Sequence, residues 1–167
     1  MKKNLLKTLL VSCMTAVMLA GCGVNADTTS NDNASEETIT VTDVRGEVEI
    51  PAEPQRIVDL SGNSDILSVL GYKVIGTANS DAYDYTKFPS YLEETLSGAE
   101  ILGYSMQDTM DVEAVMNLNP DLIVISTVQE KMYDQLSEIA PTVMIQLEAL
   151  NWKEDVKAFS KVFNKED

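Results

Sequence analysis

The stretch from Pro54 to Gly71, P-Q-R-I-V-D-L-S-G-N-S-D-I-L-S-V-L-G, decides the fold that the sequence predicts. Its apolar run at residues 57–60 follows a proline and is typical of a buried strand. Polar residues 61–64 predict a turn, and the apolar residues at 66–70 recur at helical spacing before a glycine that ends the helix. In a parallel sheet such a loop lies at the carboxyl end of its strand, where these sheets bind ligands.

The rest of the folded part repeats this alternation of strand and helix. Further strands are predicted at residues 73–78, 100–103, 121–126 and 142–147, and helices at 88–96, 111–118, 130–139 and 152–163. A β-hairpin at residues 39–41 and 48–50 precedes them. The pattern predicts an α/β fold: a single Rossmann-like lobe with a mostly parallel sheet flanked by helices.

The composition excludes several classes of protein. The 167 residues carry a net charge of −15, and histidine is absent. Such an acidic chain is a poor partner for nucleic acid, and it lacks the commonest metal ligand and general base. The two cysteines, Cys13 and Cys22, both lie near the N-terminus and leave no disulfide or zinc site for the body of the protein. We therefore expect no nucleic-acid partner, no cofactor and no metal centre.

The N-terminal residues predict export. Three lysines precede a mostly apolar segment at residues 8–20, which is too short to span a membrane. The motif Leu19-Ala20-Gly21-Cys22 then resembles the lipobox of bacterial lipoproteins. The resemblance implies that residues 1–21 are a signal peptide and that an acylated (for example palmitoylated) Cys22 anchors the chain at the extracytoplasmic face of the cell membrane. Ordinary secretion with cleavage near Ala20, or an uncleaved anchor, remain alternatives.

Residues 22–37 separate this anchor from the folded part. They are small, polar and acidic, with one valine and no aromatic residue, and they cannot bury enough apolar surface to order themselves. We interpret them as a flexible tether. The folded lobe is predicted at residues 38–167.

Three motifs carry a resemblance to a known family. They are R-G-E-V-E-I-P-A-E-P-Q-R-I-V-D-L at residues 45–60, D-V-E-A-V-M-N-L-N-P-D-L-I-V-I at 111–125 and L-S-E-I-A-P-T-V at 136–143. In this order they are similar to the periplasmic-binding-protein family that serves ATP-driven uptake of ferric siderophores, haem and cobalamin. The resemblance implies two lobes with the ligand between them, of which this sequence carries the N-terminal one. It further implies a binding protein, not an enzyme, that hands an iron chelate to an ABC permease and its ATPase.

The resemblance also places the binding residues on the loops at the carboxyl ends of the strands. The expected ligand-binding residues are Ser61, Gly62, Asn63, Asn79, Tyr83, Tyr85, Tyr104, Ser105, Thr127 and Gln129. Glu113 matches the acidic residue that docks with arginines of the permease in the family. A charge-paired contact of this kind contributes orientation and association rate more than affinity.

Several of these residues have plainer interpretations. The three tyrosines either stack on a chelate or cover the surface of the lobe. Asn63 is favoured as a cap of the helix that follows it, over a ligand contact. Glu113 also suits the first turn of a helix, although the motif match favours docking.

Residues outside the expected site are interpreted as structural. Arg56 precedes its strand and so belongs to the opposite end of the sheet, and Trp152 is expected to pack on an apolar helix face. Asp108 and Asp111 could suggest a metal, which we do not predict.

The sequence leaves the ligand and some functions open. Lys87 is the only basic residue expected near the ligand loops, which favours a weakly charged ligand such as a hydroxamate-type ferric siderophore over a bare catecholate. A haem- or cobalamin-binding relative and a truncated fragment that binds nothing are the alternatives. An enzyme lacks support, because no nucleophile elbow, P-loop or dinucleotide motif is present. A zinc- or manganese-binding lipoprotein would use histidine ligands, which this sequence lacks.

Overall fold

The computed structural model describes residues 37–79, 83–147 and 151–166. The predicted signal peptide, Cys22 and nearly all of the predicted tether lie outside the described residues, and their roles stay predictions. In the described part of the chain, no helix combines the length and the apolar character that crossing a membrane requires.

The predicted β-hairpin is present, and Asp43 and the backbone of Val44 both bond it to the main sheet. Strands β1 (Thr38–Thr42) and β2 (Glu47–Pro51) pair antiparallel. Asp43 Oδ1 accepts the N–H groups of Arg45 at 2.7 Å and Gly46 at 3.1 Å, which closes the turn. Asp43 Oδ2 accepts the N–H of Met144 at 2.7 Å, so the same side chain fixes the hairpin against the last strand of the sheet.

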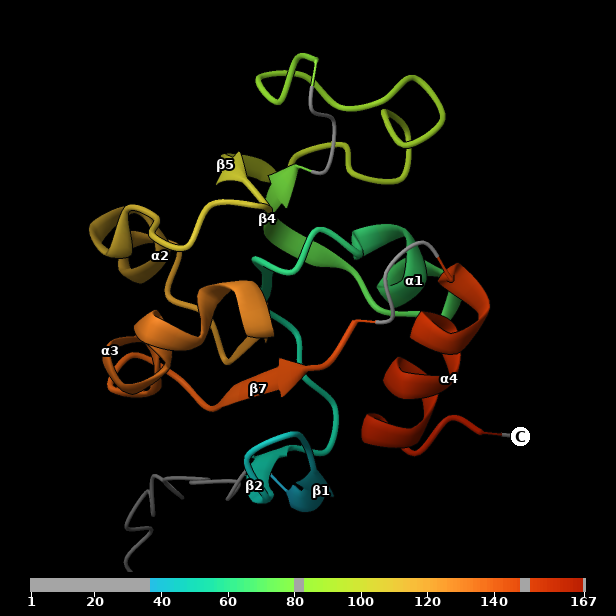
Figure 1. Cartoon of the computed structure of the whole chain (residues 1–167), viewed down its shortest axis with the longest axis vertical. Coiled ribbons are helices and arrows are strands. Elements are labelled where there is room, and N and C mark those ends of the chain that lie inside the picture. Colours follow the sequence, from blue (N-terminus) through green and yellow to red (C-terminus); the bar gives the residue numbers. More distant parts are fainter. Residues whose placement is uncertain (1–36, 80–82, 148–150, 167) are drawn as a thin grey trace, which may run out of the picture. The chain divides into compact units, whose positions relative to one another are not determined.

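Five parallel strands form the main sheet (Figure 1). They are β3 (Ile57–Asp59), β4 (Val74–Asn79), β5 (Glu100–Tyr104), β6 (Leu122–Ser126) and β7 (Thr142–Ile145). Their order is β5-β4-β3-β6-β7, so the chain builds outward from β3 in one direction and then from β6 in the other. The neighbours β3 and β6 therefore mark the topological switch point of the sheet.

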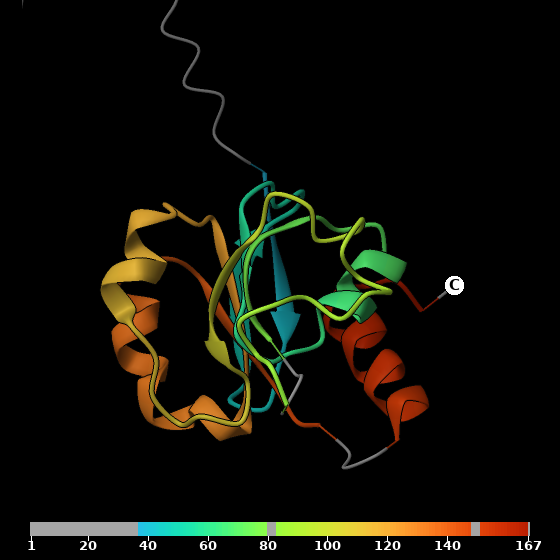
Figure 2. The ribbon, with the colours of Figure 1, turned by 90° about the horizontal axis from the view of Figure 1, so that it is seen from above.

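Helices cover both faces of the sheet (Figure 2). Helices α1 (Ser64–Val69) and α4 (Trp152–Val162) lie on one face. Helix α2 (Val112–Asn117), the 3₁₀ helix η1 (Thr127–Met132) and helix α3 (Tyr133–Ser137) lie on the other. The fold-class prediction of one α/β lobe is thereby confirmed.

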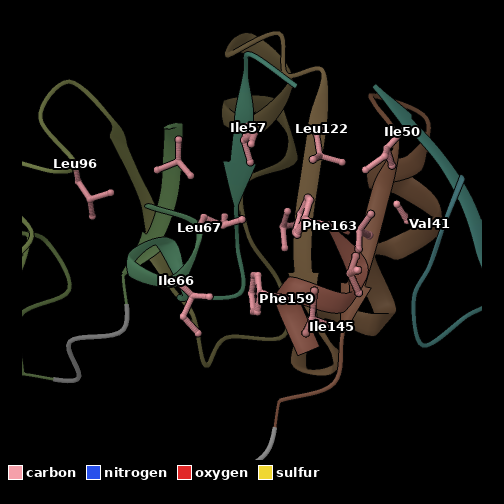
Figure 3. Close-up of a cluster of buried hydrophobic side chains, with 14 residues drawn as sticks. Val41, Ile50, Ile57, Ile66, Leu67, Leu96, Leu122, Ile145, Phe159 and Phe163 are labelled. Carbon is pink, nitrogen blue, oxygen red and sulfur yellow. The ribbon is translucent and has the colours of Figure 1, made fainter. Parts of the chain in front are cut away.

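The central strand β6 contributes to two hydrophobic cores. Leu122 and Val124 belong to the cluster that contains Phe159 of α4, part of which Figure 3 shows. Ile123 and Ile125 belong to the cluster beneath α2 and α3. Successive side chains point to opposite faces of a strand, so a run of four aliphatic residues is what a sheet covered on both sides requires.

The helix predicted at residues 88–96 does not form. The segment is a series of turns, with the Leu92 N–H bonded to the Pro89 carbonyl at 2.8 Å. Leu96 is its one buried residue. Leu96 and the partly buried Phe88 and Leu92 pack against the hydrophobic cluster that contains Phe159, so the segment buries its apolar side chains from turns and not from a helix.

The predicted loop at residues 127–129 and helix at 130–139 were wrong in their boundary. The 3₁₀ helix η1 begins at Thr127 itself, and α3 continues from Tyr133. Ser126 and Gln129 form a capping box at its start. The side chain of each residue accepts a hydrogen bond from the backbone N–H of the other. The S-x-x-Q spacing was visible in the sequence and signals this start.

The predicted packing role of Trp152 was also wrong. Its side chain is 67% exposed at the first residue of α4, whereas Phe159 is fully buried. The helix thus packs through its later turns. Gly71 has a φ of +88° directly after the C-cap of α1, which confirms its predicted helix-ending role.

Candidate functional site

The loops that follow β3 and β6 meet at one edge of the sheet. Asp59 pairs with Val124 in parallel register, and the Leu60 N–H donates to the Val124 carbonyl at 2.7 Å. Ser61 and Thr127, which follow these strands, therefore lie at the carboxyl edge of neighbouring strands. This edge at a switch point is where open parallel sheets place their ligands.

A buried carboxylate that the sequence analysis missed organises the first loop. Asp59 Oδ1 accepts the Ser61 N–H at 2.9 Å and the Ser61 hydroxyl at 2.6 Å. Its Oδ2 accepts the Asn63 N–H at 3.0 Å and the Ser64 hydroxyl at 2.6 Å, and Ser64 Oγ lies 2.7 Å from Thr77 Oγ1 of β4. Burial raises the pKa of Asp59, and these hydrogen bonds oppose the rise. The sequence feature that could have revealed this carboxylate is an acidic residue inside an apolar strand, I-V-D-L.

The predicted residues of this loop differ in exposure. Ser61 is 4% exposed, while Gly62 and Asn63 are partly exposed. Gly62 has a φ of +81°, a conformation that favours glycine. Asn63 occupies the N-cap position of α1 but makes no side-chain cap bond, and its amide instead donates to the Ser61 carbonyl at 3.2 Å. The favoured capping interpretation of Asn63 was therefore wrong.

Two of the predicted tyrosines lie together where β5 ends, one strand beyond β4. The rings of Tyr85 and Tyr104 have centroids 6.0 Å apart at an interplanar angle of 32°. Tyr83 is fully exposed. Asn79 is buried, and its amide donates to the backbone carbonyls of Tyr85 and Lys87, which holds the start of the long β4–β5 connection against the strand end.

Gln129 joins the ends of β5 and β6. Its Oε1 accepts the Ser126 N–H at 3.0 Å and the Ser126 hydroxyl at 2.9 Å. Its Nε2 donates to the carbonyls of Ser105 at 2.5 Å and Gln107 at 3.0 Å. Both Gln129 and Ser105 are buried and hold the loop backbone in place, whereas Thr127 is partly exposed.

The basic side chains near these loops are paired with acids. Lys87 Nζ lies 3.1 Å from Asp84 Oδ2, and Lys131 Nζ lies 2.8 Å from Asp108 Oδ2. The expectation that Lys87 is the only basic residue near the loops missed Lys131, which η1 places there. The hydrogen bond from Lys131 lowers the pKa of Asp108. In the described ranges, no cluster of three acidic, histidine or cysteine side chains could hold a metal ion.

Glu113 and Arg56 lie at opposite ends of α2. Glu113 is exposed in the first turn, where Asp111 Oδ1 caps the helix by accepting the N–H groups of Glu113 at 3.0 Å and Ala114 at 3.1 Å. It lines a shallow groove whose other residues are Val112, Met116, Gln135, Glu138 and Ile139. Arg56 donates to the carbonyls of Leu118 and Asn119 after the other end of the helix, which fits its structural interpretation.

A family model described as "Periplasmic binding protein" matches residues 61–167. The chain belongs to the periplasmic binding protein family. This confirms the resemblance drawn from the three motifs. The matched region begins at Ser61, so it contains all the loops at the carboxyl edge described above.

Three related proteins place the chain more closely within the periplasmic binding proteins. The probable siderophore-binding lipoprotein YfiY of Bacillus subtilis is 35% identical over 100% of this chain and 51% of its own length. The iron(3+)-hydroxamate-binding protein FhuD of the same organism is 35% identical over 89% of this chain and 45% of its own. The crystal structure of Staphylococcus aureus SirA complexed with staphyloferrin B aligns with a TM-score of 0.65 and 34% identity, covering 77% of this chain and 43% of SirA. The chain thus spans about half the length of the relatives it matches.

Proposed function

We propose that this lobe supplies half of the ligand site of an extracytoplasmic binding protein, which delivers a ferric siderophore to an ABC importer. The observation that carries the proposal is the convergence of the Ser61–Asn63 turn, the Tyr85–Tyr104 pair and Thr127 at the carboxyl edge of the sheet. The related proteins YfiY, FhuD and SirA, whose names or bound ligand concern siderophores, support it.

The predicted site residues divide into two groups by exposure. We assign ligand contact to the exposed or partly exposed ones: Gly62, Asn63, Tyr83, Tyr85, Tyr104 and Thr127. Ser61, Asn79, Ser105 and Gln129 are buried, and we assign them the support of the loop backbone. A tyrosine offers an apolar face to a chelate scaffold and a hydroxyl to its polar groups.

We infer that the ligand is a weakly charged chelate of the ferric hydroxamate type. Lys87 and Lys131 are each paired with an aspartate and have little charge to offer an anionic chelate. Binding a bare catecholate would favour unpaired cations, above all arginine. Two relatives in Bacillus subtilis, FhuD and YxeB, are named as iron(3+)-hydroxamate-binding proteins. Haem or cobalamin is the alternative ligand.

We further propose that an acylated Cys22 anchors the protein at the extracytoplasmic face of the cell membrane, after removal of residues 1–21 and through the tether of residues 22–37. The lipobox motif and the naming of relatives such as YfiY as lipoproteins support this. Glu113 would dock with a basic surface of the permease, since it is exposed beside Glu138 in a shallow groove.

Isothermal titration calorimetry tests the ligand assignment. The full chain, kept in detergent micelles, is titrated with ferrichrome, ferric enterobactin, haem and cobalamin. We expect saturable binding of ferrichrome, and a Tyr104→Ala variant should bind it about tenfold more weakly, since an aromatic contact is worth on the order of 1 kcal/mol beyond its burial.

The matched control is Tyr91→Ala, because Tyr91 is 71% exposed in the same connection as Tyr85 but outside the proposed contacts. Equal or tighter binding of ferric enterobactin would contradict the hydroxamate assignment. Heat signals from none of the four compounds would favour the alternative that the chain, about half as long as its relatives, binds no ligand by itself.

A further inference from the structure

We propose that Asp59 is a positioning residue for the ligand site, whose carboxylate holds the turn at residues 61–64 in the conformation that receives the ligand. The inference rests on the proposed function, because that function uses this turn. Asp59 is 0% exposed and cannot touch a ligand itself. Its effect is exerted through the backbone that it holds.

The hydrogen-bond pattern explains why only a carboxylate serves here. Each oxygen of Asp59 accepts one backbone N–H, from Ser61 or Asn63, and one hydroxyl, from Ser61 or Ser64. An asparagine of the same shape would turn its NH₂ group toward one of the two backbone N–H groups in either orientation. Two donors would then face each other in a buried site, where an unmade hydrogen bond is costly.

Among the described residues that hydrogen-bond to Asp59, none is a cation that offsets the buried charge. Besides Ser61 and Asn63 of its own turn, the groups that face Asp59 are the Ser64 hydroxyl from α1, Thr77 of β4 through Ser64, and the backbone of Val124 in β6. None of these groups titrates, and Asp65 on α1 is exposed. Burying a carboxylate is unfavourable unless hydrogen-bond donors surround it. The conformation of the turn supplies these donors to Asp59. The turn in question lies at the switch point between β3 and β6, where the ligand is expected.

Asp121 provides a matched control at the other end of the sheet. Its Oδ1 and Oδ2 accept the N–H groups of Arg56 at 2.8 Å and Gln55 at 2.7 Å, just before β3 begins. Asp121 therefore also holds a backbone turn with a carboxylate, but far from the proposed ligand edge. Asp59→Asn and Asp121→Asn remove the same chemical group from two turns of which only one belongs to the site.

The test compares ferrichrome affinity by calorimetry in the full chain and both variants, at a temperature where circular dichroism shows each sample folded. We expect Asp59→Asn to weaken ferrichrome binding about tenfold or more, because charge-assisted hydrogen bonds that hold the turn are lost. Asp121→Asn should change the affinity less than about twofold. Hydrogen exchange should become faster at the Ser61 and Asn63 amides in the first variant, and at the Gln55 and Arg56 amides in the second.

Two results would overturn the inference in distinguishable ways. If the unsubstituted chain binds ferrichrome and Asp59→Asn binds it equally well, the positioning role is wrong while the proposed function stands. If the unsubstituted chain binds no compound of the panel, the proposed function and the positioning role fall together. Should Asp59→Asn not fold, Ser64→Ala keeps the carboxylate and removes one donor to Oδ2, and it should weaken ferrichrome binding several-fold.

Discussion

At the scale of single residues, Gly76 in the middle of β4 is a position where any side chain would meet the neighbouring layer. A Cβ there would lie 2.5 Å from Leu118 Cδ1 and 3.0 Å from Leu102 Cδ1. We expect Gly76→Ala to lower the free energy of unfolding by about 1–3 kcal/mol, because overpacking displaces these leucines. Urea unfolding measures the change. In a Leu118→Ala background the penalty should shrink, and an equal penalty in both backgrounds would show that the close approach is not its cause.

Asp59 also gives stability a pH dependence of definite sign. Burial raises the folded-state pKa of Asp59 above its ordinary value of 3.8, so the folded protein holds this proton more tightly than the unfolded chain does. The stabilisation from that proton is complete below pH 3.8 and is lost as the pH rises through the folded-state pKa. Urea unfolding at increasing pH should therefore show the stability of the unsubstituted protein falling relative to that of Asp59→Asn.

Asp108 provides the control of opposite sign for this pH series. Its pKa is lowered by the hydrogen bond from Lys131, so any stabilisation it gives is present above pH 3.8 and lost as the pH falls through the folded-state value. Asp108 is exposed, so the effect of Asp108→Asn should be small. A pH trend for Asp59→Asn that follows that of Asp108→Asn would contradict the direction given for Asp59.

At the scale of elements, the two short helices that follow β3 and β5 begin in different ways. The Asp111 side chain caps α2 by accepting two backbone N–H groups, whereas the Asn63 side chain makes no cap bond at the start of α1. We expect Asp111→Ala to lower the free energy of unfolding by about 1 kcal/mol and Asn63→Ala to lower it clearly less. Urea unfolding of the two variants measures these losses. Equal losses of unfolding free energy would mean that capping does not distinguish Asp111 from Asn63.

The elements also differ in how far the sequence could predict them. Each strand of the sheet is a short apolar run, and burial on both faces of β6 leaves little ambiguity in L-I-V-I. The segment at residues 88–96 has leucines at helical spacing, and they do pack against the core, but this spacing does not reveal that turns and not a helix carry them. Trp152 shows a related limit, because helical periodicity identifies an apolar face without showing how far along the helix the contact extends.

The candidate site was predictable in location more than in role. The order of strands and loops was enough to place Ser61, Tyr104 and Thr127 at one edge. Gln129 is predicted as a ligand contact while its side chain is buried, because sequence order does not reveal which polar side chains turn inward. The role of Asp59 was not predicted, because its hydrogen-bond donors are backbone N–H groups and hydroxyls. Such donors give no recognisable charge pair in the sequence.

At the scale of the whole molecule, the sheet couples two cores that lie on its opposite faces. Phe159 is fully buried in one and Leu136 in the other. We expect Phe159→Ala and Leu136→Ala each to cost about 2–5 kcal/mol of unfolding free energy, and each to shift one shared transition, since β6 belongs to both cores. Thermal unfolding followed by far-ultraviolet circular dichroism and by near-ultraviolet signals tests this.

The control for the two core variants is Met116→Ala, at a methionine that is 53% exposed on α2. It should leave the midpoint of unfolding nearly unchanged. Separate transitions in Phe159→Ala, with α4 lost before the sheet, would mean that the two cores unfold independently.

The exposed position of Trp152 gives the protein a built-in optical label. It is the single tryptophan of the chain, and it stands at the start of α4, just after the connection from the carboxyl end of β7. Its indole is in water in the folded state, so its emission maximum has little room to move to longer wavelength on unfolding. Energy transfer to a coloured iron chelate at that end of the sheet would quench it. The fluorescence of this chain therefore reports on what approaches the ligand edge far better than on whether the chain is folded.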